Sequence, residues 1–523
     1  MTDIIWPLQA VEPRDVQLAA LRAGYGRPGY AYFLRQRLGK TWLALAEYRL
    51  LKENNLVDWM IVICPNSIKQ AWQDAVEEVD PYIPIHIYSS QKKKNTNYWF
   101  QKNRYGGIFI INYESVRSFY DDQGYDKFNT LRAYLVADES AKLADPDARM
   151  TKACLMFSSL CQYTRVMSGK PSKGSNNDLW AQLKFISATG RNFFQHKNEF
   201  SEQYSWQSRP KDKNTLKLKI EMDPHCFIAS DKYLKGFKKI YEAPEQVVML
   251  GEQLRMYRQM EKDLIAEINS DMKMTAPIML TKYLRLQQIS SGIGSAVQND
   301  PNLAQFTSEV YHVNLMPPSE NPRIKALKKI LKTIGDMDTN APDDAKQAEL
   351  FKLSTKVIII CRFKLSMTNL VEELTREGYK VAVMHGGMGT ELDAQKEYFH
   401  KGDAEILVAQ SQVLSFGHTL CGPDDRPCVD IIHYEVTWSL SDRAQCESRP
   451  EKMGREDPIH CHDFWASQMD KTMINALVRK EDAAMALMGY SRSLGTLHRQ
   501  EENDNAQLAN EAVNDALSIF GSE

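Results

Sequence analysis

The feature that most constrains this chain is a loop at residues 35–42, which separates an apolar run from a helical pattern. Residues 30–34 predict a buried strand and residues 43–51 predict a helix. The loop contains Gly39, Lys40 and Thr41. These residue types suit a phosphate-binding loop, because glycine lets the backbone approach phosphate, lysine reaches the β- and γ-phosphates, and threonine can ligate Mg²⁺. The full pattern has a glycine where this chain has Leu34, so the loop alone also fits an ordinary helix N-terminus.

A second motif lies further along the chain. Residues 134–137 predict a buried strand that ends in Asp138 and Glu139. A nucleoside triphosphatase needs one carboxylate at a strand end to hold Mg²⁺ through its water shell, and a second to orient the attacking water. Either acid alone would be interpreted as a solvated residue. The order and distance of the two motifs favour a nucleotide site, with Asp138 near the metal and Glu139 near the water.

Length and composition limit the class of protein. The chain has 523 residues, which predicts two to four domains, and its 43% hydrophobic and 25% charged residues are typical of a soluble globular protein. The formal net charge is only −2, so any binding to nucleic acid must come from local patches. We expect no membrane span and no secretory signal, because the sequence has neither a long apolar run nor a signal-like leader.

Cysteine and histidine usage indicates a reducing compartment and no zinc. The nine cysteines form no Cys-x-x-Cys pair, which fits reduced thiols in a cytosol. His460, Cys461 and His462 resemble part of a metal cluster. Neighbours in a strand point to opposite faces, however, and no second ligand pair lies at zinc spacing, so we do not expect a zinc site.

The pattern along the chain predicts an α/β fold with two parallel sheets. Short apolar strands alternate with helices in residues 1–195 and again in residues 321–490, and a ligand should bind at the carboxyl ends of the strands. Residues 196–320 predict a helical bridge, with a lysine-rich stretch at 209–239 that either contributes to nucleic-acid binding or forms a solvated helix face. Residues 491–523 predict an acidic, polar tail.

Cationic residues in the second α/β region are candidates for the same site. Arg443, Arg449 and Lys452 follow residues 438–441 on a helix-like stretch. A cation from a second lobe would stabilise charge that develops on the γ-phosphate. Because Arg449 stands four residues after Gln445, a helix would place both on one face. A solvated helix face is the alternative for each cation.

Taken in order, these motifs resemble the Swi/Snf-like branch of superfamily-two helicases, and especially its compact phage-encoded members. The resemblance runs from about Pro13 to Leu487. In the first part, three matching segments concern the nucleotide: residues 13–18, where the family's glutamine contacts adenine, residues 37–41, the nucleotide loop, and residues 138–141, the acid box. Residues 63–67 with Trp72, and residues 111–114, match segments that track the DNA backbone. Residues 168–171 with 178–180 match the motif that couples the lobes. In the second part, they are residues 281–288 near the junction of the lobes; 385–386 and 410–417, where the family grips DNA; and 445–454, the final motif.

The resemblance implies two RecA-like parallel-sheet lobes in tandem with a helical bridge between them. It implies an ATP hydrolase that acts as an ATP- and Mg²⁺-dependent DNA translocase or helicase in replication, recombination or repair. Its partner would be DNA, double-stranded rather than single-stranded, bound without sequence preference. Its location would be the cytoplasm, that of the host if the chain is phage-encoded.

The site residues follow from the resemblance, residue by residue. The expected nucleotide contacts are Gln17, Arg37, Leu38, Gly39, Lys40, Thr41, Gly417 and Gln445. The expected metal ligands are Thr41 and Asp138, and the expected catalytic residues are Glu139, Lys40, Arg449 and Lys452.

Three departures from the family pattern keep a second interpretation open. Ala141 replaces the histidine of the acid box, Lys170 replaces the threonine of the coupling motif, and Lys452 replaces the second arginine of the final motif. A lysine cannot provide a planar bidentate fork. The alternative is therefore an ATP-gated nucleic-acid-binding protein without motor activity. A P-loop kinase of small substrates is a third possibility, which the cationic motif of the second lobe disfavours.

Overall fold

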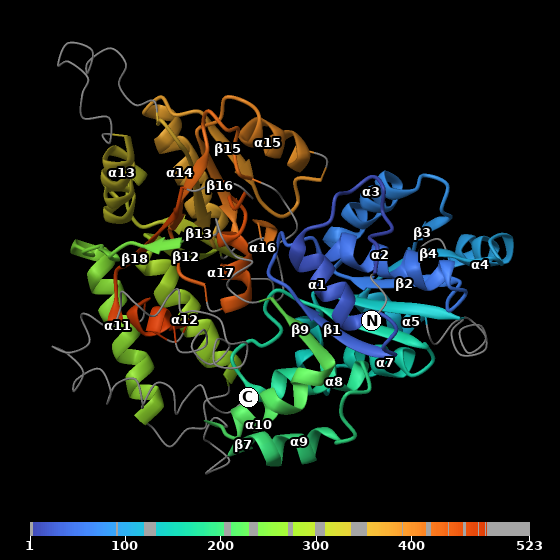
Figure 1. Cartoon of the computed structure of the whole chain (residues 1–523). Coiled ribbons are helices and arrows are strands. Elements are labelled where there is room, and N and C mark those ends of the chain that lie inside the picture. Colours follow the sequence, from blue (N-terminus) through green and yellow to red (C-terminus); the bar gives the residue numbers. More distant parts are fainter. Residues whose placement is uncertain are drawn as a thin grey trace. The chain divides into compact units, whose positions relative to one another are not determined.

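The computed structural model describes most of the chain as two compact units that divide after residue 235. The described residues are 4–89, 93–119, 132–202, 211–229, 239–269, 276–298, 309–335, 353–389, 391–414, 420–437, 439–452, 455, 457–468, 470–475 and 477–478. Each unit contains its own parallel sheet with helices around it (Figure 1). No helix among these residues is both long enough and apolar enough to cross a membrane.

The first unit is built on a sheet of seven described strands, all parallel, in the order β3-β4-β2-β5-β6-β1-β9. The strands are β1 (Gly29–Phe33), β2 (Trp59–Cys64), β3 (Ile85–Ile87), β4 (Gly107–Asn112), β5 (Ala133–Asp138), β6 (Tyr163–Met167) and β9 (Cys226–Ile228). Every residue of β2 and β5 is buried, because a central parallel strand is covered on both faces.

Helices cover both faces of this first sheet, with α2 and α3 on one side and α5, α7 and α8 on the other (Figure 1). The α-helices are α1 (Asp15–Gly24), α2 (Lys40–Glu53), α3 (Lys69–Val79), α4 (Lys93–Lys102), α5 (Tyr113–Phe119), α7 (Arg149–Ser158), α8 (Trp180–Phe185), α9 (Phe193–Phe200) and α10 (Thr215–Met222). The 3₁₀ helix η1 (Asn66–Ile68) leads into α3, and η4 (Ser140–Ala144) follows β5. A small antiparallel pair, β7 (Ser201–Glu202) and β8 (Lys211–Asp212), lies outside the sheet.

The second unit has a second parallel sheet in the order β10-β18-β17-β14-β16-β15, and β11 also pairs with β18. Its strands are β10 (Lys239–Tyr241), β11 (Glu245–Gln246), β14 (Lys356–Cys361), β15 (Val381–Met384), β16 (Ile406–Gln410), β17 (Cys428–His433) and β18 (Ile459–Trp465). Alternate residues of β14 enter two different hydrophobic clusters, one with Ile358 and Ile360 and one with Val357 and Ile359. The sheet therefore has an apolar core on each face.

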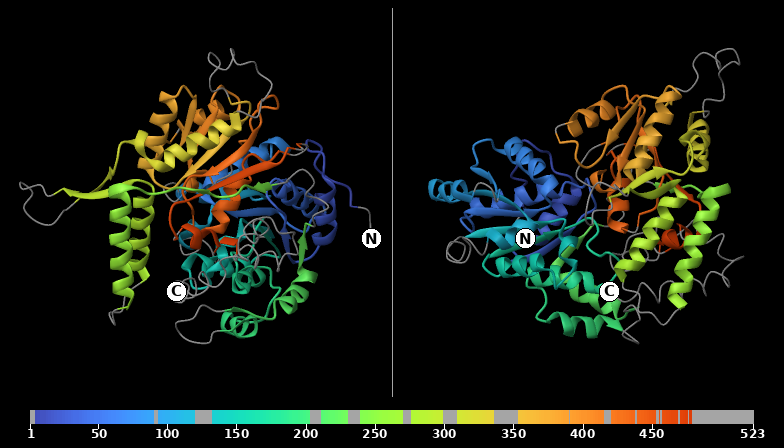
Figure 2. Two further views of the ribbon diagram at one scale, coloured as in Figure 1. Left: turned by 90° about the vertical axis from the view of Figure 1, so that its left-hand side faces the viewer. Right: turned by 180° about the vertical axis from the view of Figure 1, so that it is seen from behind.

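The helices of the second unit fall into two groups. Those around the sheet are α13 (Pro322–Gly335), α14 (Lys364–Arg376), α15 (Glu391–His400), α16 (Ser411–Leu414) and α17 (Leu440–Glu447). Helices α11 (Gly251–Asn269) and α12 (Ala276–Ser290) form a pair that extends away from this sheet (Figure 2). The antiparallel hairpin β12 (Ile293–Gln298) and β13 (Glu309–Asn314) follows α12.

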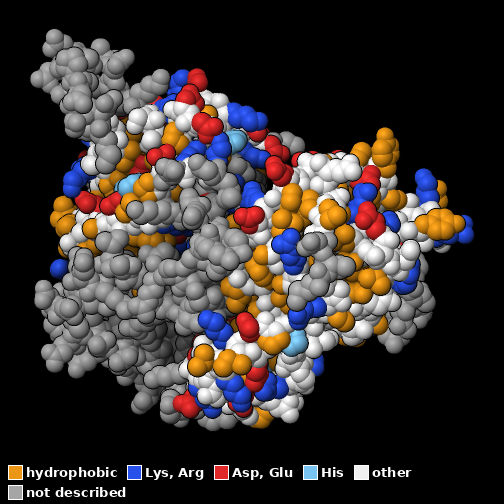
Figure 3. Space-filling model, in the orientation of Figure 1, with side chains coloured by type: hydrophobic (Ala, Val, Ile, Leu, Met, Phe, Trp, Pro, Cys, Tyr) orange, Lys and Arg blue, Asp and Glu red, His pale blue; other side chains and the backbone are white. Residues whose placement is uncertain are grey.

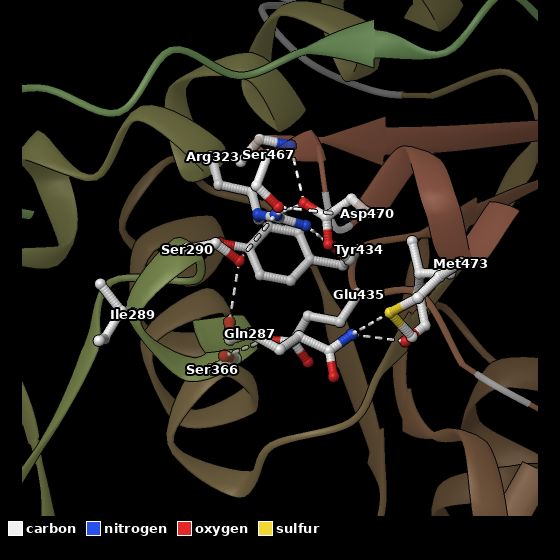
Figure 4. Close-up of polar contacts among 12 residues, drawn as sticks. Gln287, Ile289, Ser290, Arg323, Ser366, Tyr434, Glu435, Ser467, Asp470 and Met473 are labelled. Carbon is white, nitrogen blue, oxygen red and sulfur yellow. Dashed lines mark hydrogen bonds and ion pairs between the residues drawn. The ribbon is translucent and has the colours of Figure 1, made fainter. Parts of the chain in front are cut away.

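A buried polar cluster ties α12 to the second sheet (Figure 4). The Gln287 side chain donates to the Val436 carbonyl (2.6 Å) and accepts from Arg362 (2.7 Å). Arg323 donates to the Tyr434 carbonyl (2.5 Å) and to Asp470 (3.3 Å). Because buried polar groups are costly without partners, the hydrogen bonds of Gln287 hold α12 against its own unit.

The predicted α/β class with two parallel sheets is confirmed. The predicted bridge at residues 196–320 is shared between the units, because β9 joins the first sheet while β10 and β11 join the second. The predicted tail at 491–523 lies outside the described residues. The predicted domain boundaries remain predictions.

Candidate nucleotide-binding site

The candidate site begins where β1 leads through the loop into α2. Gly39 is the residue before α2 and has φ +77°, a left-handed conformation that glycine adopts without steric cost. A Cβ at this position would lie 2.3 Å from the Gln17 side-chain nitrogen, so glycine is required here. Lys40 and Thr41 are the first residues of α2, where backbone N–H groups have no partner inside the helix and attract anions.

Helix α1 holds this loop through two side chains. Gln17 is almost fully buried, donates to the Gly39 carbonyl (2.9 Å) and accepts from the Arg14 N–H (2.8 Å). The Arg14 guanidinium donates to the Arg37 carbonyl. Arg37 has φ +64°, an uncommon conformation for a residue with a side chain, which costs about 1 kcal/mol or more. The two left-handed residues of the loop are therefore each held at their carbonyl oxygen by a side chain from the α1 segment.

The nucleotide loop and the acid box meet at the carboxyl edge of the first sheet. Lys40 Nζ lies 3.8 Å from Glu139 Oε1 and 3.3 Å from the Leu34 carbonyl oxygen. The Lys40 side chain is 9% exposed and that of Glu139 is 21% exposed. Two motifs that are distant in sequence thus converge, as the sequence interpretation requires.

The two acids of the box lie in different surroundings. Asp138, the last residue of β5, is buried and accepts from the Glu139 N–H (2.9 Å) and from the Trp72 indole N–H (3.0 Å). Burial, reinforced by the charge of Glu139, raises the pKa of Asp138 to about 6, against the opposing effect of Lys40 and the two hydrogen bonds. Glu139 has φ +52°, so a strained turn separates the buried acid from the accessible one.

A buried ion pair anchors α2 to the sheet. Arg165 on β6 and Glu47 on α2 are both fully buried, and Arg165 Nε donates to Glu47 Oε2 at 3.0 Å. The hydroxyls of Tyr32 on β1 and Tyr134 on β5 each donate to the same carboxylate at 2.9 Å. Helix α2, which carries Lys40 and Thr41, is therefore linked to the three strands β1, β5 and β6.

A second buried link joins the acid box to the segment that resembles the coupling motif. Ser140 Oγ donates to Gln182 Oε1 (2.7 Å), and Gln182 Nε2 donates to the Pro171 carbonyl (2.6 Å). Ser140 and Gln182 are fully buried. Ala141, which stands where the family has histidine, is also buried.

In the second unit the final motif does not have the predicted helical form. Helix α17 ends at Glu447 and is capped by Ser448, so Arg449 lies in the following turn, and the prediction that a helix places Arg449 and Gln445 on one face is wrong. The Arg449 N–H donates to the Cys446 carbonyl (3.0 Å), and its own carbonyl accepts from Leu420 (3.1 Å). The Arg449 side chain is buried.

The other two candidate cations of the second unit, Arg443 and Lys452, have acidic partners nearby. Arg443 forms two 2.8 Å hydrogen bonds to Asp463 and one to Glu447, all buried. Its predicted role as a phosphate-directed cation is therefore unsupported, because its guanidinium is used inside the fold. Lys452 is partly exposed and contacts Asp424. Gly417, an expected nucleotide contact, lies outside the described residues.

The lysine-rich stretch is partly neutralised by neighbouring acids. Lys217 on α10 contacts Glu199, and Lys213 lies 3.9 Å from Glu202. Basic and acidic side chains are interspersed in this region of the surface (Figure 3). Lys239 lies 3.3 Å from Glu451, and although burial opposes it, the charges of the nearby acids raise the pKa of this lysine. Lys232, Lys235 and Lys238 are outside the described residues.

The histidines around Cys461 bind separate acids. His460 Nδ1 lies 2.7 Å from Glu242, and His462 Nε2 lies 3.0 Å from Asp430, while Cys461 is buried. Within the described part of the chain, no three His, Cys, Asp or Glu side chains are grouped closely enough to hold a metal ion by themselves.

The residues of the first unit fit a nucleotide with Mg²⁺. Mg²⁺ prefers oxygen ligands and is usually held by one or two protein groups together with substrate phosphates and water. The Thr41 hydroxyl and the Asp138 carboxylate are oxygen donors of this kind, and Asp138 and Lys40 both lie close to Glu139. The donor chemistry therefore matches the expected metal and phosphate.

Two contacts of this site were not predicted from sequence. Trp72 was expected at the DNA backbone, whereas its indole is buried and bonds to Asp138, 66 residues away. Gln182 was not singled out at all. The local sequence does not predict the hydrogen-bond partner of Trp72 or Gln182, because the packing of α3 and α8 on the sheet determines that partner.

Comparison with known proteins identifies the family. The SNF2-related domain matches residues 37–292, from the nucleotide loop to the end of α12. The chain is 20% identical over 466 residues to the SWI/SNF-related matrix-associated actin-dependent regulator of chromatin subfamily A-like protein 1 of Drosophila melanogaster, covering 86% of this chain and 52% of that protein. It is 21% identical over 501 residues to the protein CHROMATIN REMODELING 5 of Arabidopsis thaliana, covering 93% of this chain and 27% of that protein.

A solved structure is also similar. The Sulfolobus solfataricus SWI2/SNF2 ATPase core in complex with dsDNA matches with 16% identity and a TM-score of 0.40, covering 93% of this chain and 97% of that one. The chain spans about half the length of the Drosophila relative and about a quarter of the Arabidopsis relative. Residues 37–292 of this chain therefore match the SNF2-related domain, which is of the Swi/Snf-like type.

Proposed function

We propose that this protein is an ATP- and Mg²⁺-dependent DNA translocase that hydrolyses ATP. The observation that carries the proposal is the convergence of Lys40 with Glu139, 3.8 Å apart, at the carboxyl edge of the first sheet. Ligands of open α/β sheets bind at this edge. The match of residues 37–292 to the SNF2-related domain supports the same activity. Replication, recombination or repair is the proposed setting.

Each residue of the first unit has a proposed task. Lys40 and the N-terminal N–H groups of α2 bind the phosphates, and Gln17, Arg37 and Leu38 hold the loop and the base. Thr41 and Asp138 hold Mg²⁺, which when bound supplies positive charge to the phosphate oxygens. Glu139 orients the attacking water and accepts its proton. Because Glu139 is the more exposed of the two acids, it suits contact with water, while the buried Asp138 suits a fixed ligand.

The second unit contributes the remaining proposed residues. Arg449 stabilises charge on the γ-phosphate, Lys452 is a weaker auxiliary cation, and Gly417 and Gln445 contact the nucleotide. This part of the proposal rests on the order of the motifs in the sequence. The partner of Lys452, Asp424, competes for its charge.

DNA is the proposed track, double-stranded and recognised without regard to sequence. The motifs at residues 63–67 and 111–114 support contact with phosphates, and the small net charge implies local contacts. Phosphate contacts release counterions, so affinity should fall steeply with salt. Binding that is selective for sequence and insensitive to salt would contradict this part of the proposal.

The direct test compares ATP hydrolysis with double-stranded DNA, single-stranded DNA and RNA in parallel. We expect stimulation, strongest with double-stranded DNA, and no turnover in the Lys40→Ala variant, whose fold should be intact by circular dichroism. Full turnover in Lys40→Ala would show that this loop is not part of the ATP-binding site. Absence of hydrolysis in the unaltered protein, with ATP-dependent DNA binding retained, would support the alternative of an ATP-gated binding protein, which Ala141, Lys170 and Lys452 favour.

A further inference from the structure

We propose that Trp72 is a positioning residue for the metal-binding carboxylate of Asp138, and that through it helix α3 couples DNA contact to hydrolysis. This inference rests on the proposed function, because it assigns a coupling element to the same site. The contact lies inside the first unit.

The hydrogen bond itself is well placed to orient the carboxylate. Trp72 Nε1 donates to Asp138 Oδ2 at 3.0 Å, while the N–H of Glu139 donates to Oδ1 at 2.9 Å. The Trp72 side chain is 1% exposed and that of Asp138 is 5% exposed. A donor on each oxygen fixes the rotation of the carboxylate, as partners of metal ligands commonly do. Trp72 is the only one of these two donors that belongs to another element of the fold.

Helix α3 reaches across the edge of the sheet from β2 to both neighbouring strands. Lys69 and Trp72, three residues apart, lie on its buried face. Lys69 Nζ donates to the Asn112 side chain at the end of β4 (2.7 Å), and Trp72 donates to Asp138 at the end of β5. Strands β4 and β5 flank β2 in the sheet. The helix is therefore pinned on both sides by polar contacts at the ends of these strands.

The opposite side of the same segment is open to solvent. Asn66 and Ser67 in η1 and Gln70 in α3 are exposed. Residues 63–67 are those expected to contact the DNA backbone. A force on these exposed residues would move α3, and the buried Trp72 would transmit that movement to Asp138.

A parallel polar chain runs from β4 to the turn after the acid box. Asn112 Nδ2 donates to Glu114 Oε2 (2.9 Å), and Glu114 Oε1 lies 3.6 Å from Lys142 in η4. Because Lys69 on α3 donates to Asn112, helix α3 contacts this polar chain as well as Asp138. The Trp72 contact is the direct one, since it ends on the proposed metal ligand itself.

The test uses the full-length Trp72→Phe variant, which keeps an aromatic ring and removes the N–H donor. The matched control is Trp59→Phe, because Trp59 on β2 is equally buried and packs against Trp99 and Phe100. Two quantities are measured: the Mg²⁺ concentration for half-maximal binding of a fluorescent ATP analogue, and the ratio of DNA-stimulated to basal hydrolysis.

We expect Trp72→Phe to raise the Mg²⁺ midpoint about tenfold, the usual size for loss of a partner to a metal ligand, and to lower the stimulation ratio. Trp59→Phe should change neither. In the Asp138→Asn background, Trp72→Phe should have little further effect on the Mg²⁺ midpoint. Equal midpoints and ratios for Trp72→Phe and Trp59→Phe would overturn the inference and leave Trp72 a core aromatic residue.

Two further readouts keep the inference distinguishable from misfolding and from failure of the proposed function. If Trp72→Phe does not fold, 3-benzothienylalanine at position 72 replaces the N–H by sulfur with almost the same ring shape, and the same shift in Mg²⁺ midpoint is expected. An unchanged midpoint in that protein overturns the inference. A complete lack of ATP binding in the unaltered protein would instead overturn the proposed function.

Discussion

Asp138 and Glu139 are neighbours whose side chains have different surroundings. The first is buried and held by two donors, and the second follows a left-handed turn and lies near Lys40. The position of both acids at the end of a buried strand was predictable, because an apolar run precedes them in the sequence. The partner of each side chain was not, since Trp72 and Lys40 lie far away in the sequence and reach the acids only after the sheet has formed.

Glu139→Gln should bind ATP but hydrolyse it at least about 10²-fold more slowly, the usual size of a general-base contribution. The amide keeps the shape of the side chain but cannot accept the proton from water. Single-turnover hydrolysis and analogue binding measure the two effects separately. Glu53→Gln, in an exposed ion pair with Arg49 on α2, is the matched control and should be unaffected. Normal turnover in Glu139→Gln would show that another residue orients the attacking water.

Arg165→Met should destabilise the first unit by about 3–5 kcal/mol, because it leaves the buried Glu47 carboxylate without its cation. Thermal unfolding followed by calorimetry measures the change. Arg132→Met removes a partner from an ion pair with Asp58 that is largely exposed, and should leave the unfolding temperature nearly unchanged. Equal effects of the two substitutions would mean that Glu47 is neutral in the folded protein.

At the scale of elements, the long strands and helices were predictable and the short ones were not. The apolar runs of β2, β4, β5 and β14 have enough residues to show their type. Strands β9, β10 and β11 have only two or three residues, and their pairing is set by β1 and β18. The end of α17 was also misplaced, because Ser448 caps the helix before Arg449, although Pro450 directly after Arg449 signals a helix stop in the sequence.

The link between η4 and α8 gives an element-scale prediction. Gln182→Leu should cost about 1–3 kcal/mol of unfolding free energy, because Ser140 Oγ and the Pro171 carbonyl lose a buried partner. Ser140→Ala should cost less in the Gln182→Leu background than alone, with a coupling of at least about 0.5 kcal/mol. Urea unfolding of the four proteins completes the cycle. Additive costs would show that the Ser140–Gln182 contact does not join these two elements.

At the scale of the whole molecule, the proposed function requires both units. Arg449→Ala should lower ATP turnover about 10³-fold or more, the usual value of a cation at the transferring phosphate, while analogue binding largely survives. Arg449→Lys keeps the charge without the planar fork and should recover part of the rate. Circular dichroism must show that both variants fold, because the native side chain is buried. Unchanged turnover in Arg449→Ala would contradict a role for the second unit in hydrolysis.

Lys452→Arg tests whether the departure from the family pattern limits the rate. If the contact with Asp424 holds the lysine away from the nucleotide, arginine should raise DNA-stimulated hydrolysis, since it can bind an acid and a phosphate oxygen together. The stimulation ratio is the measurement, and Asp424→Asn should move it in the same direction. No change in either variant would show that Lys452 serves only the local ion pair.

Strand β9 has a practical consequence for anyone who produces the nucleotide-binding lobe alone. It covers one side of β1 through the pairs Ala31–Cys226, Tyr32–Phe227 and Phe33–Ile228. A fragment that ends at residue 195 would leave the aromatic run of β1 with unpaired backbone groups, which is the kind of uncharged edge that recruits other chains. A fragment that extends to Ala229 keeps this cover. Solubility of the isolated lobe therefore depends on three residues that lie well beyond its last nucleotide-binding motif.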